Sequence, residues 1–166
     1  MLEEDIKDPP LILLVEDRED DIVLIQKSFR RAKIEPALQI VRGGEEAISY
    51  LSGTGKYSNR AEYPLPWLVL LDLKMQRVDG FEVLQWIRKE PELQALIVVV
   101  LTSSEQIWDV NKAYESGANS FMVKPVDFDD TAALANSIIQ YWLQHNRFPQ
   151  AIRREPRSTI GEGQKY

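Results

Sequence analysis

The sequence predicts an α/β fold in which helices cover both faces of a parallel β-sheet. Three observations predict this class. Short apolar segments recur five times before residue 146, helical patterns alternate with them, and most connections are short. The chain has 166 residues, of which 44% are hydrophobic, which is enough for one domain with a substantial core.

The apolar segments are predicted strands because each is a continuous hydrophobic run, which is typical of a strand buried on both faces. The first run, Leu-Ile-Leu-Leu-Val, is followed directly by acidic residues. The first, third and fourth runs are the most hydrophobic, so we expect them at the centre of the sheet. In chain order the predicted strands are 11–15, 37–41, 67–71, 96–101 and 120–123.

The segments after each strand place apolar residues three or four positions apart, as in a helix that packs one face on a sheet. Gly53, Pro91 and Gly117 mark the ends of the second, third and fourth of these segments. In chain order the predicted helices are 20–33, 44–52, 81–89, 106–116 and 127–145.

Two stretches do not fit the alternation. The connection 53–66 is long for a loop between a helix and a strand, and the chain beyond Phe148 is polar. We expect an N-terminal extension at 1–9, one domain at 10–145, and a polar, basic tail at 146–166. About twenty residues are too few for a folded output domain, so none is expected.

The composition excludes several classes of protein. A net charge of −6 and a pI near 4.9 argue against a nucleic-acid-binding protein, which is normally basic. The absence of Cys rules out disulfides and thiolate chemistry, as expected in a reducing compartment. The N-terminus is too acidic for a signal peptide, and no run reaches the about 18 apolar residues of a membrane span. We therefore expect a cytoplasmic protein that does not bind membranes.

The charge is unevenly distributed along the chain. Residues 146–166 carry a net charge of +3, so the preceding residues carry −9. Part of this acidity lies at the ends of the predicted strands, which is where ligands of open parallel sheets bind.

Three carboxylates follow two of the predicted strands. Glu16 and Asp17 come after the first strand, and Asp72 comes after the third. Carboxylates this close repel one another unless a cation is present, and a hard divalent ion prefers oxygen ligands. The sequence therefore predicts a Mg2+ site, which Mn2+ can also occupy.

Thr102 and Lys124 follow the fourth and fifth strands. A hydroxyl and a mobile ammonium group are both suited to the oxygens of a phosphoryl group. Asp72 is then the natural nucleophile, since carboxylates attack phosphorus to form aspartyl phosphates. The pattern predicts a phosphoacceptor site.

Each feature also has a plain structural explanation. Glu16-Asp17 is typical of a pair that caps a helix, Asp72 of a turn, and Thr102-Ser103 of a helix N-cap. Lys-Pro is a common turn dipeptide. Their coincidence at one edge of the sheet, with complementary chemistry, favours the functional interpretation.

The same residues make the sequence similar to a known family. Glu16-Asp17, Leu71–Met75, Asp79-Gly80, Leu101–Ser103 and Lys124-Pro125 resemble the motifs of a response-regulator receiver domain of the CheY-like type, over about residues 10–145. The resemblance implies a flavodoxin-like, doubly wound sheet with five strands in the order 2-1-3-4-5. It also implies a stand-alone response regulator of a two-component phosphorelay, which assists its own phosphoryl transfer and dephosphorylation but is not an enzyme.

The resemblance further implies roles in phosphoryl transfer and signalling. Asp72 would accept the phosphoryl group from the histidine of a sensor kinase, and Thr102 and Lys124 would contact that group. Phe121 and Thr102 would report phosphorylation to the face made by the fourth helix, fifth strand and fifth helix. The Lys124-Pro125 peptide bond would be cis.

The implied metal ligands are Asp17, Asp72 and the backbone carbonyl of Lys74, with Glu16 acting through water. One position departs from the family pattern, because Gln76 stands where Pro is usual. The loss of the prolyl ring is expected to loosen the metal geometry without removing a ligand.

The connection 53–66 points to one group within the family that the sequence resembles. Together with the preceding Tyr50 and the following Trp67 to Lys74, it is similar in style to the small receivers that serve cyanobacterial and bacterial phytochromes. This implies a phytochrome-type kinase as partner. The alternative is that the connection is a solvated excursion without function.

The last predicted helix has two apolar stripes, whereas packing on a sheet needs one. The second stripe, Leu134, Ile138 and Tyr141, predicts an interface, either of a homodimer or with an unknown downstream partner. The alternative is a wide buried face.

Other classes of protein fit less well. A phosphatase of the haloacid-dehalogenase type needs a second Asp two positions after its nucleophile, where this chain has Lys74. A flavodoxin needs a phosphate-binding loop after the first strand, and the acidic segment 16–21 would repel phosphate in the absence of a metal ion. A receiver-fold interaction module that works without phosphorylation remains an alternative.

Overall fold

The computed structural model describes residues 9–31 and 36–149. The predictions for most of the N-terminal extension, for the end of the first helix at 32–33 and for 150–166 of the tail lie outside these residues.

Five parallel strands form one sheet in the order β2-β1-β3-β4-β5, which confirms the predicted fold class and strand order. β1, β3 and β4 occupy the centre, and almost all of their side chains are buried. The sheet is therefore centred on the three most hydrophobic segments of the sequence. The strands are β1 (Leu11–Val15), β2 (Ala37–Val41), β3 (Leu68–Leu71), β4 (Ile97–Thr102) and β5 (Ser120–Val123).

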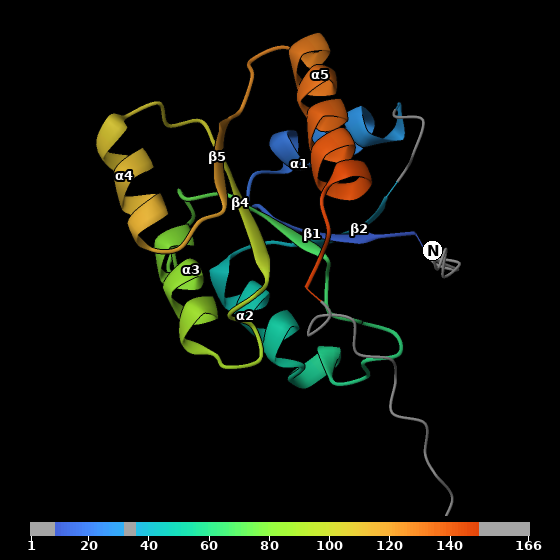
Figure 1. The fold of residues 1–166 in the computed structure, drawn as a ribbon, viewed down its shortest axis with the longest axis vertical. Coiled ribbons are helices and arrows are strands. Elements are labelled where there is room, and N and C mark those ends of the chain that lie inside the picture. Colours follow the sequence, from blue (N-terminus) through green and yellow to red (C-terminus); the bar gives the residue numbers. More distant parts are fainter. Residues whose placement is uncertain (1–8, 32–35, 150–166) are drawn as a thin grey trace, which may run out of the picture.

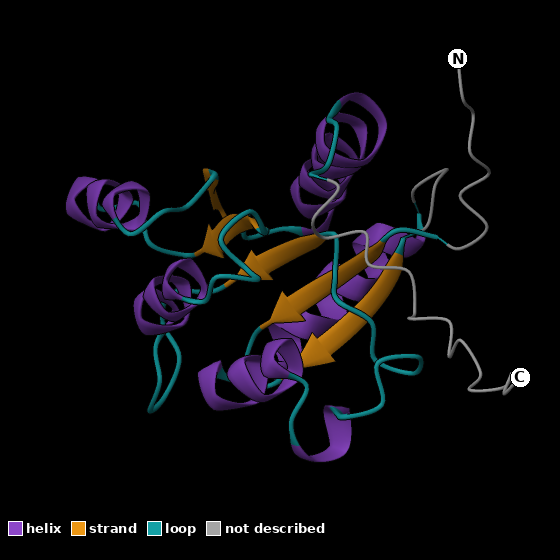
Figure 2. Cartoon of the chain, turned by 60° about the horizontal axis from the view of Figure 1, so that its bottom comes forward, coloured by secondary structure: helices purple, strands orange, loops and turns teal. Residues whose placement is uncertain are grey.

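Helices cover both faces of the sheet (Figures 1 and 2). α1 and α5 pack against each other on one face, over a core that includes Ile25 and Leu70. The opposite face is covered by α2, α3 and α4, which contribute Leu51, Val83 and Ala113 to the second core. The helices are α1 (Glu19–Arg30), α2 (Gly44–Ser52), α3 (Gly80–Lys89), α4 (Ile107–Glu115) and α5 (Phe128–Ile138).

The last helix departs from the prediction in two ways. α5 ends at Ile138 and continues as a π-helical segment, Ile139–His145, rather than as one regular helix. Ile138 is 1% exposed and belongs to the core between α1 and α5, so the prediction that it lies on an outer stripe is wrong. The reason is that α5 packs on α1 as well as on the sheet, which buries two adjacent stripes. Leu134 is half-buried, and only Tyr141 of the three predicted interface residues is well exposed, at 57%.

The connection between α2 and β3 is anchored to the domain at a few residues, although most of its residues are exposed. It contains a short 3-10 helix, Gly55–Tyr57, and the ring of Tyr57 is buried. The rings of Tyr50 and Tyr57 meet edge to face with centroids 4.9 Å apart, and Tyr63 lies 5.0 Å from Tyr57. The guanidinium group of Arg60 donates to the carbonyls of Tyr50 at 2.7 Å and Leu51 at 2.6 Å, which satisfies the C-terminal end of α2.

The folded unit extends beyond the predicted limit at residue 145. Phe148 is 9% exposed, and its ring meets that of Trp67 with centroids 5.1 Å apart. The chain therefore turns back after the π-helical segment and packs beside the start of β3. Within the described part of the chain, no helix combines the length and apolar composition that crossing a bilayer requires.

Candidate functional site

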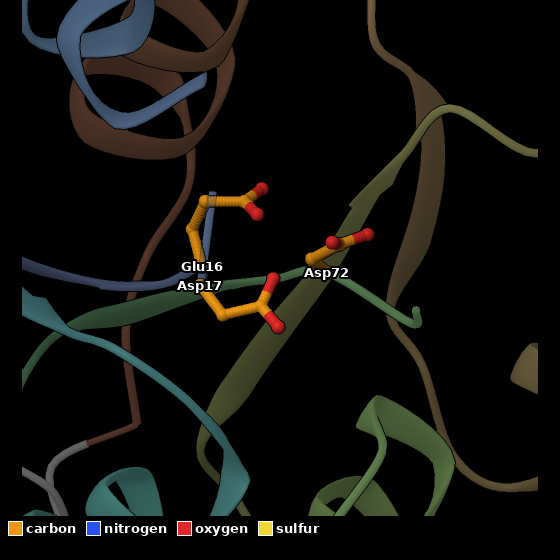
Figure 3. A group of neighbouring side chains, drawn as sticks. All are labelled: Glu16, Asp17 and Asp72. Carbon is orange, nitrogen blue, oxygen red and sulfur yellow. The ribbon is translucent and has the colours of Figure 1, made fainter. Parts of the chain in front are cut away.

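Three carboxylates meet at the carboxyl end of the sheet (Figure 3). Glu16, Asp17 and Asp72 each place a carboxylate oxygen within 4.8 Å of the others. The register explains this, because Val15 and Leu71 are paired across β1 and β3, and the site residues directly follow them. The N–H of Asp72 donates to the carbonyl of Val15 at 3.1 Å, which extends the pairing into the site.

Burial makes this cluster electrostatically costly. Glu16 is 0% exposed and Asp72 is 4% exposed. The pKa of Glu16 is raised to about 7, chiefly by burial and also by the charge of Asp72, while the hydrogen bond from Lys124 opposes both effects. A donor set made only of carboxylate oxygens fits a hard divalent cation, which would remove the repulsion.

Lys124 lies among these carboxylates. Its Nζ forms an ion pair with Glu16 and lies 3.0 Å from Oδ2 of Asp21 and 3.5 Å from Oδ2 of Asp72. Burial acts to lower the pKa of Lys124, but the charges of Asp72 and Glu16 and the hydrogen bonds to Glu16 and Asp21 raise it above the ordinary value. The site therefore holds a charged ammonium group beside Asp72.

Thr102 ends β4 and is fully buried, and its carbonyl accepts a 2.8 Å hydrogen bond from the N–H of Lys124. The hydroxyl oxygen of Thr102 accepts from the N–H of Ser104 at 3.4 Å. Phe121 in β5 is half-buried and packs against the core of the α2–α4 face. The fold thus brings Thr102 and Lys124 together at the same sheet edge as the carboxylates.

The loop after β3 is held by close backbone contacts. A Cβ atom on Gly80 would lie 2.2 Å from the carbonyl oxygen of Asp72, so only glycine fits there. Asp79 caps α3 by accepting from the N–H of Glu82 at 2.9 Å, and the Glu82 carboxylate accepts from the N–H of Asp79. This capping box could have been found in the sequence, because Asp and Glu three residues apart at a helix start are its signature.

Gln76 makes a backbone hydrogen bond that proline, the usual residue at this position in the family, could not make. Its N–H donates to Oδ2 of Asp17 at 3.2 Å, and proline has no N–H. This hydrogen bond to a candidate metal ligand restrains the loop at the position where the loss of proline was expected to loosen it. Arg77, the next residue, adopts a left-handed backbone with φ of 65°.

Two further outcomes concern single residues. The described residues contain no cis peptide bond, so the prediction for Lys124-Pro125 is wrong; the trans form is also the intrinsically favoured one for a bond to proline. That the carbonyl of Lys74 binds the metal stays a prediction. The N–H of Lys74 donates to Oδ1 of Asp72 at 3.4 Å, which places this residue beside the site. The sequence marks Asp21 only as part of the acidic segment 16–21 and assigns it no role in the site, because its partner Lys124 lies far along the chain.

The comparisons with known proteins agree with this geometry. Residues 12–136 match the model of the response regulator receiver domain family. The chain is 39% identical over 146 residues to the probable methanogenesis regulatory protein FilR2 of Methanothrix harundinacea (strain 6Ac), covering 86% of this chain and 90% of that protein. It is 37% identical over 143 residues to the response regulator Rcp1 of Synechocystis sp. (strain ATCC 27184 / PCC 6803 / Kazusa), covering 86% and 95% of the two chains.

Solved structures show the same relationship. The Mn2+-bound form of Rcp1 superposes with a TM-score of 0.77 at 37% identity, over 85% of this chain and 99% of that one. The phosphorylated cyanobacterial phytochrome response regulator RcpA superposes with a TM-score of 0.79 at 33% identity, over the same shares of the two chains. By sequence, fold and site, this chain belongs to the response regulator receiver domain family.

Proposed function

We propose that Asp72 accepts a phosphoryl group from the phosphohistidine of a sensor kinase. The single observation that carries the proposal is the environment of Asp72, a 4%-exposed carboxylate beside two others and 3.5 Å from the Lys124 ammonium group. An oxygen of Asp72 forms the new O–P bond while the P–N bond breaks. The kinase imidazole keeps that electron pair and takes up a proton.

The residues around Asp72 supply the charge that this transfer needs. Lys124 and the Thr102 hydroxyl are placed to contact the phosphoryl oxygens, whose negative charge they would share. A Mg2+ ion held by Asp17, Asp72 and the Lys74 carbonyl, with Glu16 acting through water, would neutralise the remaining charge. Because Asp72 is consumed in each transfer and regenerated by hydrolysis, the protein is proposed as a phosphoacceptor that assists its own reactions, not as an enzyme.

The partner proposed for this chain is a phytochrome-type histidine kinase in the cytoplasm. Support comes from the relative RcpA, which is named as a phytochrome response regulator. Phosphorylation would be reported by Thr102 and Phe121 to the face made by α4, β5 and α5, where an unknown downstream partner would bind.

Incubation with acetyl phosphate and Mg2+, followed by intact mass measurement, tests the phosphoacceptor. We expect one phosphoryl adduct that is stable in acid and labile in base, and that Asp72→Asn does not form. Asp79→Asn is the matched control, because this carboxylate in the same loop caps α3 and should still allow the adduct. A parent protein without any adduct at saturating phosphodonor would instead favour the interaction module that works without phosphorylation.

We further propose that the protein forms a homodimer through the last helix, with Tyr141 and the exposed part of Leu134 at the interface. Tyr141→Glu is expected to yield a monomer in sedimentation, since a buried carboxylate without a partner opposes association. Ile138→Glu is unsuited to this test because Ile138 lies in the core. A parent protein that already sediments as a monomer would contradict the dimer.

A further inference from the structure

We propose that Asp21 is a positioning residue that holds the Lys124 ammonium group when a divalent cation binds the neighbouring carboxylates. This inference rests on the metal site of the proposed function. The observation behind it is that Lys124 contacts three carboxylates, of which Glu16 and Asp72 belong to the candidate metal group and Asp21 does not.

Lys124 and a divalent cation compete for the same oxygens. Glu16 and Asp72 are almost fully buried, and Nζ of Lys124 pairs with both. An oxygen that is bonded to an ammonium group is less available to a metal ion, and two cations at the same carboxylates repel each other. Metal binding therefore requires Lys124 to give up part of its pairing with Glu16 and Asp72.

Asp21 makes this exchange possible at low cost. The Lys124 side chain is only 10% exposed, so without another partner its displaced charge would be buried and unpaired. Oδ2 of Asp21 lies 3.0 Å from Nζ and remains available when the metal engages Asp72 directly and Glu16 through water. Lys124 then keeps a charged partner and stays beside Asp72, where phosphoryl oxygens would arrive.

The position of Asp21 in the fold suits this role. It lies in the first turn of α1, on the side that faces the β5–α5 connection, and is 24% exposed. Among the described residues, a second basic group near it is Arg18, whose Nε lies 3.9 Å away on a side chain that is 66% exposed and therefore a weak competitor. Asp20, the preceding residue, is exposed and has the same charge, which makes it a matched control.

Mn2+ affinity, measured by the EPR signal of the free ion, tests the inference without phosphoryl transfer. Loss of the negative charge of Asp20 or of Asp21 weakens Mn2+ binding through long-range electrostatics. Asp21→Asn is expected to raise the Kd about tenfold more than Asp20→Asn does, because Lys124 then stays on Glu16 and Asp72. Asp21→Glu should restore most of the affinity. In a Lys124→Met background, the two Asn variants should differ by no more than about twofold, since the competing cation is gone.

The outcomes separate this inference from the proposed function. Equal effects of Asp21→Asn and Asp20→Asn in the parent protein would overturn the role of Asp21 even if Asp72 is phosphorylated. A parent protein that does not bind Mn2+ would overturn both. Failure to form a phosphoryl adduct, with the difference between the two variants intact, would overturn the phosphoacceptor alone and support the role of Asp21.

Discussion

At the residue scale, the position of Asp72 depends on a glycine further along the chain. Gly80 donates its N–H to the carbonyl of Leu73 at 3.0 Å, and its Cα faces the backbone of Asp72 so closely that a Cβ would lie 2.2 Å from the Asp72 oxygen. Backbone cannot rotate away as a flexible side chain can, so any other residue at position 80 must displace the loop that begins at Asp72.

Gly80→Ala is therefore expected to lower the free energy of unfolding by about 2–4 kcal/mol and to weaken Mn2+ binding. Gly55→Ala is the matched control, because Gly55 has φ of 58° and a methyl group there would meet no atom within 4 Å. It should cost only about 1 kcal/mol, for the left-handed backbone, and leave Mn2+ affinity unchanged. Urea unfolding and Mn2+ titration measure both; equal stability of the two variants would contradict the close-contact argument.

At the element scale, the connection between α2 and β3 is fastened to α2 through Tyr50. Tyr50 is fully buried, and its hydroxyl donates to the carbonyl of Pro64 at 2.7 Å. Burial raises the pKa of Tyr50 from 10.0 to about 12. The folded protein thus keeps the phenol neutral over a pH range in which the unfolded chain loses this proton.

This shift predicts a loss of stability in alkali. Because the pKa is raised in the folded state, the stabilising contribution of Tyr50 is complete below pH 10 and falls as the pH rises to about 12. By that pH the loss amounts to about 2 kcal/mol. Tyr50→Phe removes the bond to Pro64 at every pH, at a cost of about 1 kcal/mol, but lacks the titration. The stability advantage of the parent over the variant, from urea unfolding, should therefore shrink above about pH 9, vanish between about pH 10.5 and 11, and reverse in sign by about pH 11.5. A constant difference would contradict the buried, neutral phenol.

Sequence patterns predicted the limits of some helices and strands well and those of the last helix poorly. β1 and β2 begin and end where the hydrophobic runs predict, and α2 and α3 lie within a residue of their predicted limits. The last helix differs, since its regular part ends at Ile138 and its buried face is wider than one stripe. Periodicity records which residues are apolar, whereas the second buried stripe depends on the packing of α1 against α5.

At the scale of the whole molecule, the site links metal binding to folding. Three carboxylates that repel one another are held together by the paired ends of β1 and β3, so a cation that binds only the folded chain stabilises it. Mn2+ at about one hundred times its Kd is expected to add about 2.7 kcal/mol to the free energy of unfolding. This corresponds to a rise in Tm of about 5–10 °C, which EDTA should reverse.

Asp17→Asn provides the control for this stabilisation. It removes one candidate ligand that is only half-buried, so the metal-free protein should be no less stable than the parent. Its Tm should respond little to Mn2+. A full response of the Asp17→Asn variant would show that the stabilising ion binds elsewhere.

The sequence by itself determined the class of the fold, the central strands and the residues at their carboxyl ends, because continuous apolar runs and the side chains that directly follow them are local features. In this way Glu16, Asp17, Asp72, Thr102 and Lys124 could all be named from the order of the residues alone. Only the tertiary structure decided that Ile138 is core, that Phe148 packs on Trp67 and that Asp21 pairs with Lys124. Each of these depends on the distance between elements that are far apart in the chain, and that distance is set by how the helices pack on the sheet.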